Sequence, residues 1–149
     1  MEQTLILIKP DGATRKLTGL TIDRLDATGL EMVGAKMVSV SEKLAREHYA
    51  ALSDKPFFEG LIKYIRGEFH GIKDHRVLAL VYRGENAIKA VRQVAGATNP
   101  EQAAAGTIRG SFGRITTAGR YENVTHASSD PTDAAREVSL WFKKDEVLP

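Results

Sequence analysis

Apolar residues along the chain follow two patterns: short continuous runs, and stretches in which they recur every three or four positions. The continuous runs are bounded by turn-forming residues and predict strands at 4–9, 30–40, 77–82 and about 123–125. The recurring spacing predicts helices over about 17–28, 41–52, 56–65, 86–95 and 131–142. In the run 30–40 the apolar residues occupy both parities, which predicts a strand that is covered on both faces.

The predicted elements reduce to the skeleton βαββαβ. This order favours an α+β fold, a ferredoxin-like sandwich in which added helices pack on a four-stranded antiparallel sheet. A doubly wound parallel sheet remains the alternative, because the pattern does not fix the strand order. Residues 96–119 form a long loop rich in Gly, Ala and Thr, and loops of this length inside a domain are usually functional. The absence of an internal linker predicts a single domain over residues 1–149.

Composition narrows the function classes. The chain has no cysteine, which excludes disulfides, thiolate metal sites and cysteine nucleophiles. Its net charge of +2 is too small to predict a nucleic-acid partner, although it is compatible with binding small anions. The apolar run Leu5–Ile8 is too short for a signal peptide or a membrane span, so we expect a cytoplasmic location and no membrane association.

The stretch "NVTHASSD" (123–130) places His126 between a predicted strand and a predicted helix. An isolated histidine at such a junction is most often a solvated loop residue. Here the following helix carries Glu137, and a carboxylate that accepts a hydrogen bond from one imidazole nitrogen leaves the other nitrogen free to act as a nucleophile. The spacing alone does not decide whether Glu137 points at His126. The other histidines have no zinc-ligand spacing with His126, so a zinc site is not expected.

Several cationic side chains indicate an anionic ligand. Arg92 and Arg109 lie on a short helix and in the long loop, where the fork of a guanidinium suits phosphate oxygens, and Thr98 offers a hydroxyl nearby. Lys9 ends the first strand, where it either reaches solvent or meets an anion. Neither a P-loop nor a Rossmann glycine motif is present, so a polyphosphate would depend on side chains and Mg²⁺.

Phe57 and Phe58 are adjacent, so on a helix the two rings point about 100° apart and only one can face the core fully. Two interpretations are compatible with this geometry. Either both rings are accommodated in the core, or the outward ring is a platform on which a base stacks.

The segments "TLILIKPDG", "HYAALSDKPFF", "GATNPEQAAAGTIRG", "NVTHASSD" and "EVSLWF" resemble, in order along nearly the whole chain, nucleoside diphosphate kinase. The resemblance implies transfer of the γ-phosphate of a nucleoside triphosphate, usually ATP, to a nucleoside diphosphate. It implies a ping-pong route through a phosphohistidine, with Mg²⁺ on the phosphates rather than on protein side chains. It also implies a homo-oligomer, with a hexamer favoured over a tetramer.

The resemblance assigns roles residue by residue. His126 matches the phosphorylated histidine, Glu137 the glutamate that orients it, and Ser128 the serine beside it. The residues that match the phosphate-binding set are Arg92, Thr98 and Arg109, while Lys9 and Asn123 match those at the ribose hydroxyls and the transferring phosphate. Tyr49 matches the tyrosine near the histidine, and Phe57 with Leu61 the wall on which the base stacks.

The chain departs from the family pattern at three places. Ser129 stands where the family usually has aspartate, and Asp130 follows it. The loop 66–76 and the segment 114–122 are both longer than the family's. We therefore expect a changed rim around unchanged chemistry.

Two other functions remain open at this level. One is a ferredoxin-like module that binds single-stranded nucleic acid, although the chain lacks paired strand aromatics and has a small charge. The other is a relative that has lost catalysis and serves as a scaffold, although the retained polar residues argue against it.

Overall fold

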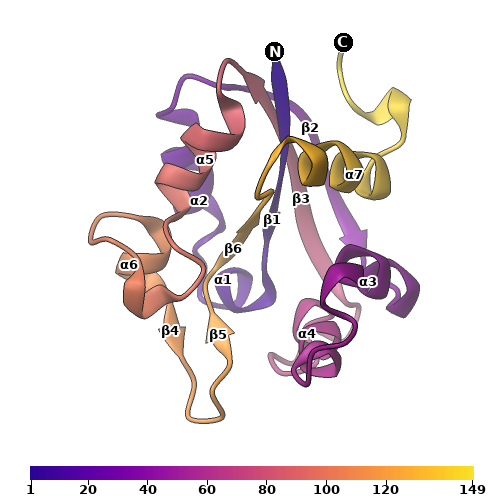
Figure 1. Ribbon diagram of the computed structural model, residues 1–149, viewed down its shortest axis with the longest axis vertical. Helices are drawn as coiled ribbons and strands as arrows, with labels where there is room; N and C mark the ends of the chain where they lie inside the picture. The colour runs from indigo at the N-terminus through magenta and orange to yellow at the C-terminus, as the bar shows by residue number, and fades with distance from the viewer.

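The computed structural model describes all 149 residues, from Met1 to Pro149. Its main sheet has four strands in the order β2-β3-β1-β6, and every neighbouring pair is antiparallel (Figure 1). The strands are β1 (Glu2–Ile8), β2 (Glu31–Ser39), β3 (Arg76–Gly84) and β6 (Thr125–Ala127). This order is that of the βαββαβ skeleton. The ferredoxin-like prediction is confirmed, and the parallel alternative is wrong.

Helices cover both faces of the sheet, as Figure 1 shows. On one face lie α2 (Thr18–Asp26) and α5 (Ala87–Ala95), and on the other lie α3 (Glu42–His48), α4 (Phe58–Ile65) and α7 (Pro131–Trp141). Side chains of a strand alternate between its faces. Accordingly Leu5 and Leu7 enter the larger core cluster, on the α3, α4 and α7 side, while Ile6 and Ile8 enter the cluster under α2 and α5.

Strand β2 is an exception to the sequence prediction. The run 30–40 predicts a strand covered on both faces, but β2 is an edge strand. Met32 and Met37 are 38% and 57% exposed. The prediction of full coverage is wrong, because apolar residues of both parities do not distinguish a central strand from an edge strand that keeps some apolar side chains in contact with solvent.

The turn after β1 is a short helix, α1 (Pro10–Thr14). The start of this helix is hydrogen-bonded to the backbone of Val124, two residues before His126. The backbone N–H of Lys9 donates to the carbonyl of Val124 (2.9 Å), and a carboxylate oxygen of Asp11 accepts from the N–H of Val124 (2.9 Å). A Cβ on Gly12 would lie 2.8 Å from the Val124 carbonyl oxygen, so only glycine fits there. Val124 has φ of +70°, which is strained for a β-branched residue. The contacts with α1 stabilise that conformation.

The long loop predicted over 96–119 contains local structure. It includes two short helices, η2 (Pro100–Gln102) and α6 (Ile108–Phe112), and the first strand of a hairpin formed by β4 (Arg114–Ile115) and β5 (Tyr121–Glu122). The remaining short helices are η1 (Ala50–Leu52) and η3 (Lys144–Glu146). No helix in the structure combines the length and the apolar content that a membrane span requires.

Candidate active site

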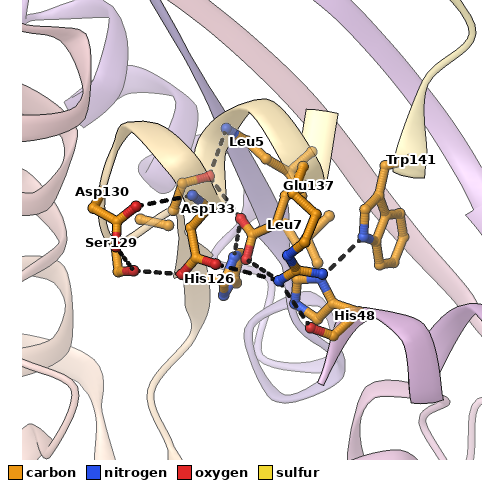
Figure 2. Close-up of polar contacts among 12 residues, drawn as sticks. Leu5, Leu7, His48, His126, Ser129, Asp130, Asp133, Glu137 and Trp141 are labelled. Carbon is orange, nitrogen blue, oxygen red and sulfur yellow. Dashed lines mark hydrogen bonds and ion pairs between the residues drawn. The ribbon is translucent and has the colours of Figure 1, made fainter. Parts of the chain in front are cut away.

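His126 is the middle residue of β6, where pairing with β1 determines the direction of its side chain. It pairs with Leu7 across the antiparallel ladder, and residues directly opposite each other project from the same face of a sheet. The imidazole therefore faces α7, which carries Glu137 (Figure 2). The Nε2 atom of His126 lies 2.9 Å from a carboxylate oxygen of Glu137. Glu137 therefore does point at His126, which the sequence spacing alone could not decide.

Ser128 fixes the carboxylate of Glu137. Its hydroxyl donates to Glu137 (2.6 Å) and accepts from the backbone N–H of Leu5 (3.1 Å). The serine side chain is fully buried, so both of its hydrogen bonds are made inside the protein. The Ser128 hydroxyl therefore links Glu137 to the backbone of Leu5 in β1, so the sheet as well as α7 positions the carboxylate.

The hydrogen bond to Glu137 determines the protonation of His126. A carboxylate accepts, so Nε2 of the imidazole carries the proton and Nδ1 keeps a lone pair. Nδ1 has no hydrogen-bond partner in the structure. Burial lowers the pKa of His126 well below its ordinary value, and the positive charges of Lys9 and Arg109 lower it further. The ring is therefore neutral at physiological pH and offers Nδ1 as a nucleophile.

A second buried histidine, His48, packs its ring edge against His126 with the centroids 4.5 Å apart. The indole N–H of Trp141 donates to Nδ1 of His48 (3.1 Å), so Nε2 of His48 must carry its proton. Ligand atoms of His48, His126 and Glu137 lie within 4.8 Å of one another. A metal ion there would have to break the hydrogen bond from Trp141. These three residues, as they are hydrogen-bonded here, do not fit a metal centre.

Two arginines are anchored on either side of His126. Arg109 on α6 donates to the carbonyl of Thr125 (2.8 Å) and to that of Gly96 (2.9 Å), while Arg92 on α5 donates to the carbonyl of Ala127 (3.5 Å). Arg109 is only 3% exposed. Burial, together with the charge of Arg92, lowers the pKa of Arg109 to about 10, so it remains cationic. The main chain on both sides of the imidazole therefore carries a guanidinium group that an anion can neutralise.

Lys9 and Asn123 form a pair at the end of β1. The ammonium group of Lys9 donates to the side-chain oxygen of Asn123 (2.8 Å), and the amide nitrogen of Asn123 donates to the carbonyl of Thr98 (2.9 Å). Burial and the charge of Arg109 lower the pKa of Lys9 to about 7. Thr98 itself is exposed. The asparagine thus connects β1 with the loop that comes after α5.

The predicted base-binding residues lie on α4 and at its start. Phe58 is buried, whereas Phe57 is 53% exposed, so the two rings diverge and the outward one is Phe57. Leu61 comes four residues later and shares the same helix face. The hydrogen bond and the ring contact of the His126 imidazole go to Glu137 and His48, and not to Phe57 or Leu61. Tyr49 packs its ring edge on His48 at 4.7 Å, and its hydroxyl is buried without a partner. Burial raises the pKa of Tyr49, which keeps it a neutral donor.

Asp130 and Ser129 serve the start of α7. A carboxylate oxygen of Asp130 accepts from the N–H of Asp133 (2.9 Å), which makes Asp130 the helix cap. The hydroxyl of Ser129 donates to the carboxylate of Asp133 (2.5 Å). Of the two residues at the predicted departure from the family pattern, Asp130 therefore caps α7, and Ser129 holds a side chain of its first turn (Figure 2).

Sequence reasoning missed several polar residues of the site. Asp11 is buried, accepts from the hydroxyl of Tyr64 and holds Val124 in place. His48 and Trp141 support the imidazole from behind. The partners of these residues are 53 or more positions away along the chain, so no local spacing could indicate them.

Comparisons with known proteins agree with this geometry. A sequence model of the family described as nucleoside diphosphate kinase matches residues 2–147. Among curated relatives, the nucleoside diphosphate kinase of Archaeoglobus fulgidus is 47% identical over 99% of this chain and 91% of its own. That of Synechocystis is 44% identical, with the same coverage.

Solved structures give the same result. The enzyme of Borrelia burgdorferi, a transition-state mimic with vanadate and ADP, superposes with a TM-score of 0.87 at 36% identity, covering 99% of this chain and 90% of that one. The Halobacterium salinarum enzyme in complex with CDP has a TM-score of 0.85 and 41% identity, covering 99% of this chain and 91% of that one. The likeness therefore spans nearly the whole of each chain.

Proposed function

Because the chain belongs to the nucleoside diphosphate kinase family, we propose that His126 carries the phosphoryl group that this enzyme moves from a nucleoside triphosphate to a nucleoside diphosphate. One observation supports this role above the others. The lone pair of a neutral imidazole, fixed at its other nitrogen by Glu137, faces a site with arginines anchored on either side of it. That arrangement pairs a nucleophile with the cations that its substrate needs.

In the first half-reaction Nδ1 of His126 attacks the γ-phosphorus. A P–N bond forms, the bond from phosphorus to the bridging oxygen breaks, and the nucleoside diphosphate leaves with that electron pair. The proton on Nε2 stays, and Glu137 stabilises the positive charge that the ring acquires. In the second half-reaction a terminal oxygen of the acceptor diphosphate attacks the same phosphorus and the P–N bond breaks. Splitting the transfer lets one site serve each donor and acceptor in turn.

The phosphates are held by Arg92, Arg109 and Lys9, with Thr98 at the edge of the site. These cations offset the negative charge on the transferring group, where catalysis is mainly positioning and electrostatics. Mg²⁺ enters as part of the substrate, bound to phosphate oxygens and water. When bound, it neutralises charge on the terminal phosphates. The carboxylates that follow His126 have partners of their own: Asp130 caps α7, and Asp133 accepts from Ser129 and pairs with Arg136.

The nucleoside is held at a distance from the reacting atoms. We assign the ribose hydroxyls and the transferring phosphate to Lys9 and Asn123, a role that their mutual hydrogen bond supports. Tyr49, whose ring packs on His48, offers a neutral hydroxyl. Exposed Phe57 and half-buried Leu61 offer an apolar face for the base. Stacking does not depend on which base is present, and relatives have been seen with ADP and with CDP.

A reaction without acceptor tests this proposal. Enzyme mixed with ATP and Mg²⁺ is expected to release one equivalent of ADP per active site and then stop, because His126 holds the phosphoryl group until an acceptor arrives. Adding GDP should convert the stored phosphoryl group into one equivalent of GTP. Quenched-flow measurement of both nucleotides checks this result. ADP that forms only when an acceptor is present would contradict the two-step route.

The pKa of Lys9 predicts a pH dependence. In the free enzyme this pKa lies at about 7, so the ammonium group loses its proton as the pH rises above that value. Because kcat/KM reports groups of the free enzyme, kcat/KM for ATP is expected to fall by ~10-fold between about pH 6.5 and 8.5. Bound phosphates keep Lys9 protonated, so kcat should change little over the same range.

His126 does not obscure this profile, since its pKa lies well below the range of the titration. The Lys9→Gln variant is the control: its kcat/KM should start lower and stay level with pH. An unchanged decline in that variant would assign the titration to another group.

We also propose a homo-oligomer, with a hexamer favoured over a tetramer as the sequence resemblance implies, and a cytoplasmic location. The short helix at the Asn99-Pro100 loop, which in hexameric members takes part in trimer contacts, is capped here by the Asn99 side chain (3.0 Å to the N–H of Glu101).

A further inference from the structure

The two segments that the sequence analysis predicts to be longer than in the family meet each other in the folded protein. The first is the loop 66–75, between α4 and β3, and the second is the hairpin 114–122. Nε2 of His70 donates to one carboxylate oxygen of Glu122 (3.0 Å), and Nε of Arg114 donates to the other (2.8 Å). The guanidinium of Arg120 stacks over the ring of Phe69 at 3.9 Å. We call this pair of segments the clasp.

Each half of the clasp is internally ordered. In the loop, Gly67 has φ of +73° and packs against Ile72, while the imidazole of His75 hydrogen-bonds to the carbonyl of Arg66 (2.7 Å). In the hairpin, the N–H of Thr116 donates to the carbonyl of Arg120 (2.9 Å). A contact between two ordered segments constrains the residues adjacent to them in the chain.

The hairpin leads directly into the nucleotide site. Glu122 immediately precedes Asn123, whose side chain binds Lys9. On the loop side, the ring of His70 packs edge-on against Tyr64 (5.6 Å between centroids), and the hydroxyl of Tyr64 donates to Asp11.

Asp11 in turn accepts from the N–H of Val124, the residue after Asn123. The clasp therefore acts on both sides of Asn123: directly through Glu122, and indirectly through Tyr64 and Asp11. It also links α4, which carries Leu61, with the strand that carries His126.

Glu122 is the centre of the clasp. Its side chain is 8% exposed, whereas that of Arg114 is 65% exposed. Burial by itself raises the pKa of a carboxyl group, but hydrogen bonds from Arg114 and His70 outweigh burial and hold the pKa of Glu122 below its ordinary value. A buried charge with two donors is costly to separate from them, so the contact holds the two segments in one arrangement.

We propose that Glu122 is a positioning residue for nucleotide binding, which joins the loop 66–75 to the hairpin 114–122 and thereby fixes Asn123 and Lys9. This inference rests on the proposed roles of Asn123 and Lys9 at the nucleotide. Glu122 itself touches neither His126 nor the transferring phosphate, so its loss affects nucleotide affinity more than the rate of phosphoryl transfer.

The test is the single-turnover phosphorylation of the enzyme by ATP and Mg²⁺ at increasing ATP concentration. For Glu122→Ala we expect the half-saturating ATP concentration to rise ~10-fold while the maximal rate stays within about threefold of the parent. Glu122→Gln keeps an acceptor for His70, so its half-saturating ATP concentration should lie between those of the parent and Glu122→Ala. A maximal rate that falls as far as the affinity, or an unchanged half-saturating concentration, would overturn the proposal.

Asp74→Ala is the matched control, because Asp74 lies in the same loop but forms an exposed ion pair with Arg76 and does not touch the hairpin. Its half-saturating concentration should equal that of the parent. If Asp74→Ala reproduces the effect of Glu122→Ala, general loosening of the loop explains the result and Glu122 has no special role.

His70→Ala keeps the proposal testable if Glu122→Ala does not fold. It should weaken ATP binding in the same direction, and in the double variant with Glu122→Gln the two effects should be less than additive in free energy. Equilibrium binding of ADP, measured by calorimetry, separates this inference from the proposed mechanism. ADP affinity depends on the clasp even if His126 never becomes phosphorylated. If the parent enzyme forms no phosphoenzyme, only the proposed mechanism is refuted.

Discussion

The His126→Gln variant is expected to lose at least about 10⁴-fold in kcat, because the chemistry depends on an unprotonated ring nitrogen that glutamine does not have. The substituted amide can still donate a hydrogen bond to Glu137, so the buried carboxylate keeps a partner and the fold should survive. Steady-state formation of GTP from ATP and GDP measures the loss. Thermal unfolding of the same samples shows that it does not come from unfolding.

A second histidine supplies the control for this experiment. His75 has φ of +55°, a conformation that asparagine tolerates better than most residues, and it lies in the loop 66–75 away from the imidazole of His126. His75→Asn should keep kcat within a few-fold of the parent. If His126→Gln retained a tenth or more of the parent kcat, another group would be the phosphoryl carrier.

Arg109→Ala is expected to have the next largest effect, lowering kcat/KM by ~10²–10³-fold, since one of the charges that offset the transferring phosphoryl group disappears. The substitution should also destabilise the protein by about 2–4 kcal/mol, because the carbonyls of Gly96 and Thr125 lose their donors in a buried setting. Enzyme kinetics and chemical denaturation measure the two effects separately.

Two further variants separate the effect of the positive charge of Arg109 from the effect of its hydrogen bonds. Arg109→Lys keeps the positive charge but cannot donate to both carbonyls, so we expect a smaller loss of kcat/KM together with most of the loss of stability. Arg24→Ala removes a half-buried arginine whose exposed hydrogen bond also reaches this loop, at the carbonyl of Gly106 (3.2 Å), and should change neither quantity much. Equal losses of kcat/KM in Arg24→Ala and Arg109→Ala would show that loop order, and not phosphate binding, is what Arg109 provides.

The fold was predictable from the sequence where burial gives a clear pattern. The order of strands and helices could be inferred from apolar spacing, and the start of α7 from Asp130 and Pro131. The edge position of β2 was not predictable, since the same apolar pattern suits a strand with one neighbour or two. The short helices and the hairpin of 96–122 were missed because side-chain caps and tertiary contacts, and not apolar spacing, stabilise them.

The site was predictable where its residues are close in sequence. His126 and Glu137 are separated by only 11 positions across one strand–helix junction, so their pairing could be proposed and only its geometry had to be seen. Asp11 and Tyr64 have partners in distant segments, and local sequence indicates only a turn at Asp11.

The contact between the loop 66–75 and the hairpin 114–122 was also not predictable from local sequence. Comparison with the family pattern identifies each of them, but only the fold shows that His70 and Glu122 meet. Contacts of this kind depend on how the strands between them are ordered, which local sequence does not specify.

The decisive measurement is the position of the phosphoryl group in the isolated phosphoenzyme, because the whole mechanism depends on Nδ1 of His126. The enzyme is treated with ATP and Mg²⁺, freed of nucleotide at neutral to alkaline pH, and analysed by mass spectrometry of its peptides and by NMR of the phosphorylated ring. We expect an acid-labile, base-stable phosphoryl group on Nδ1 of His126 that passes to GDP. A phosphoryl group on Nε2, on another residue, or on none while the enzyme turns over would refute the mechanism.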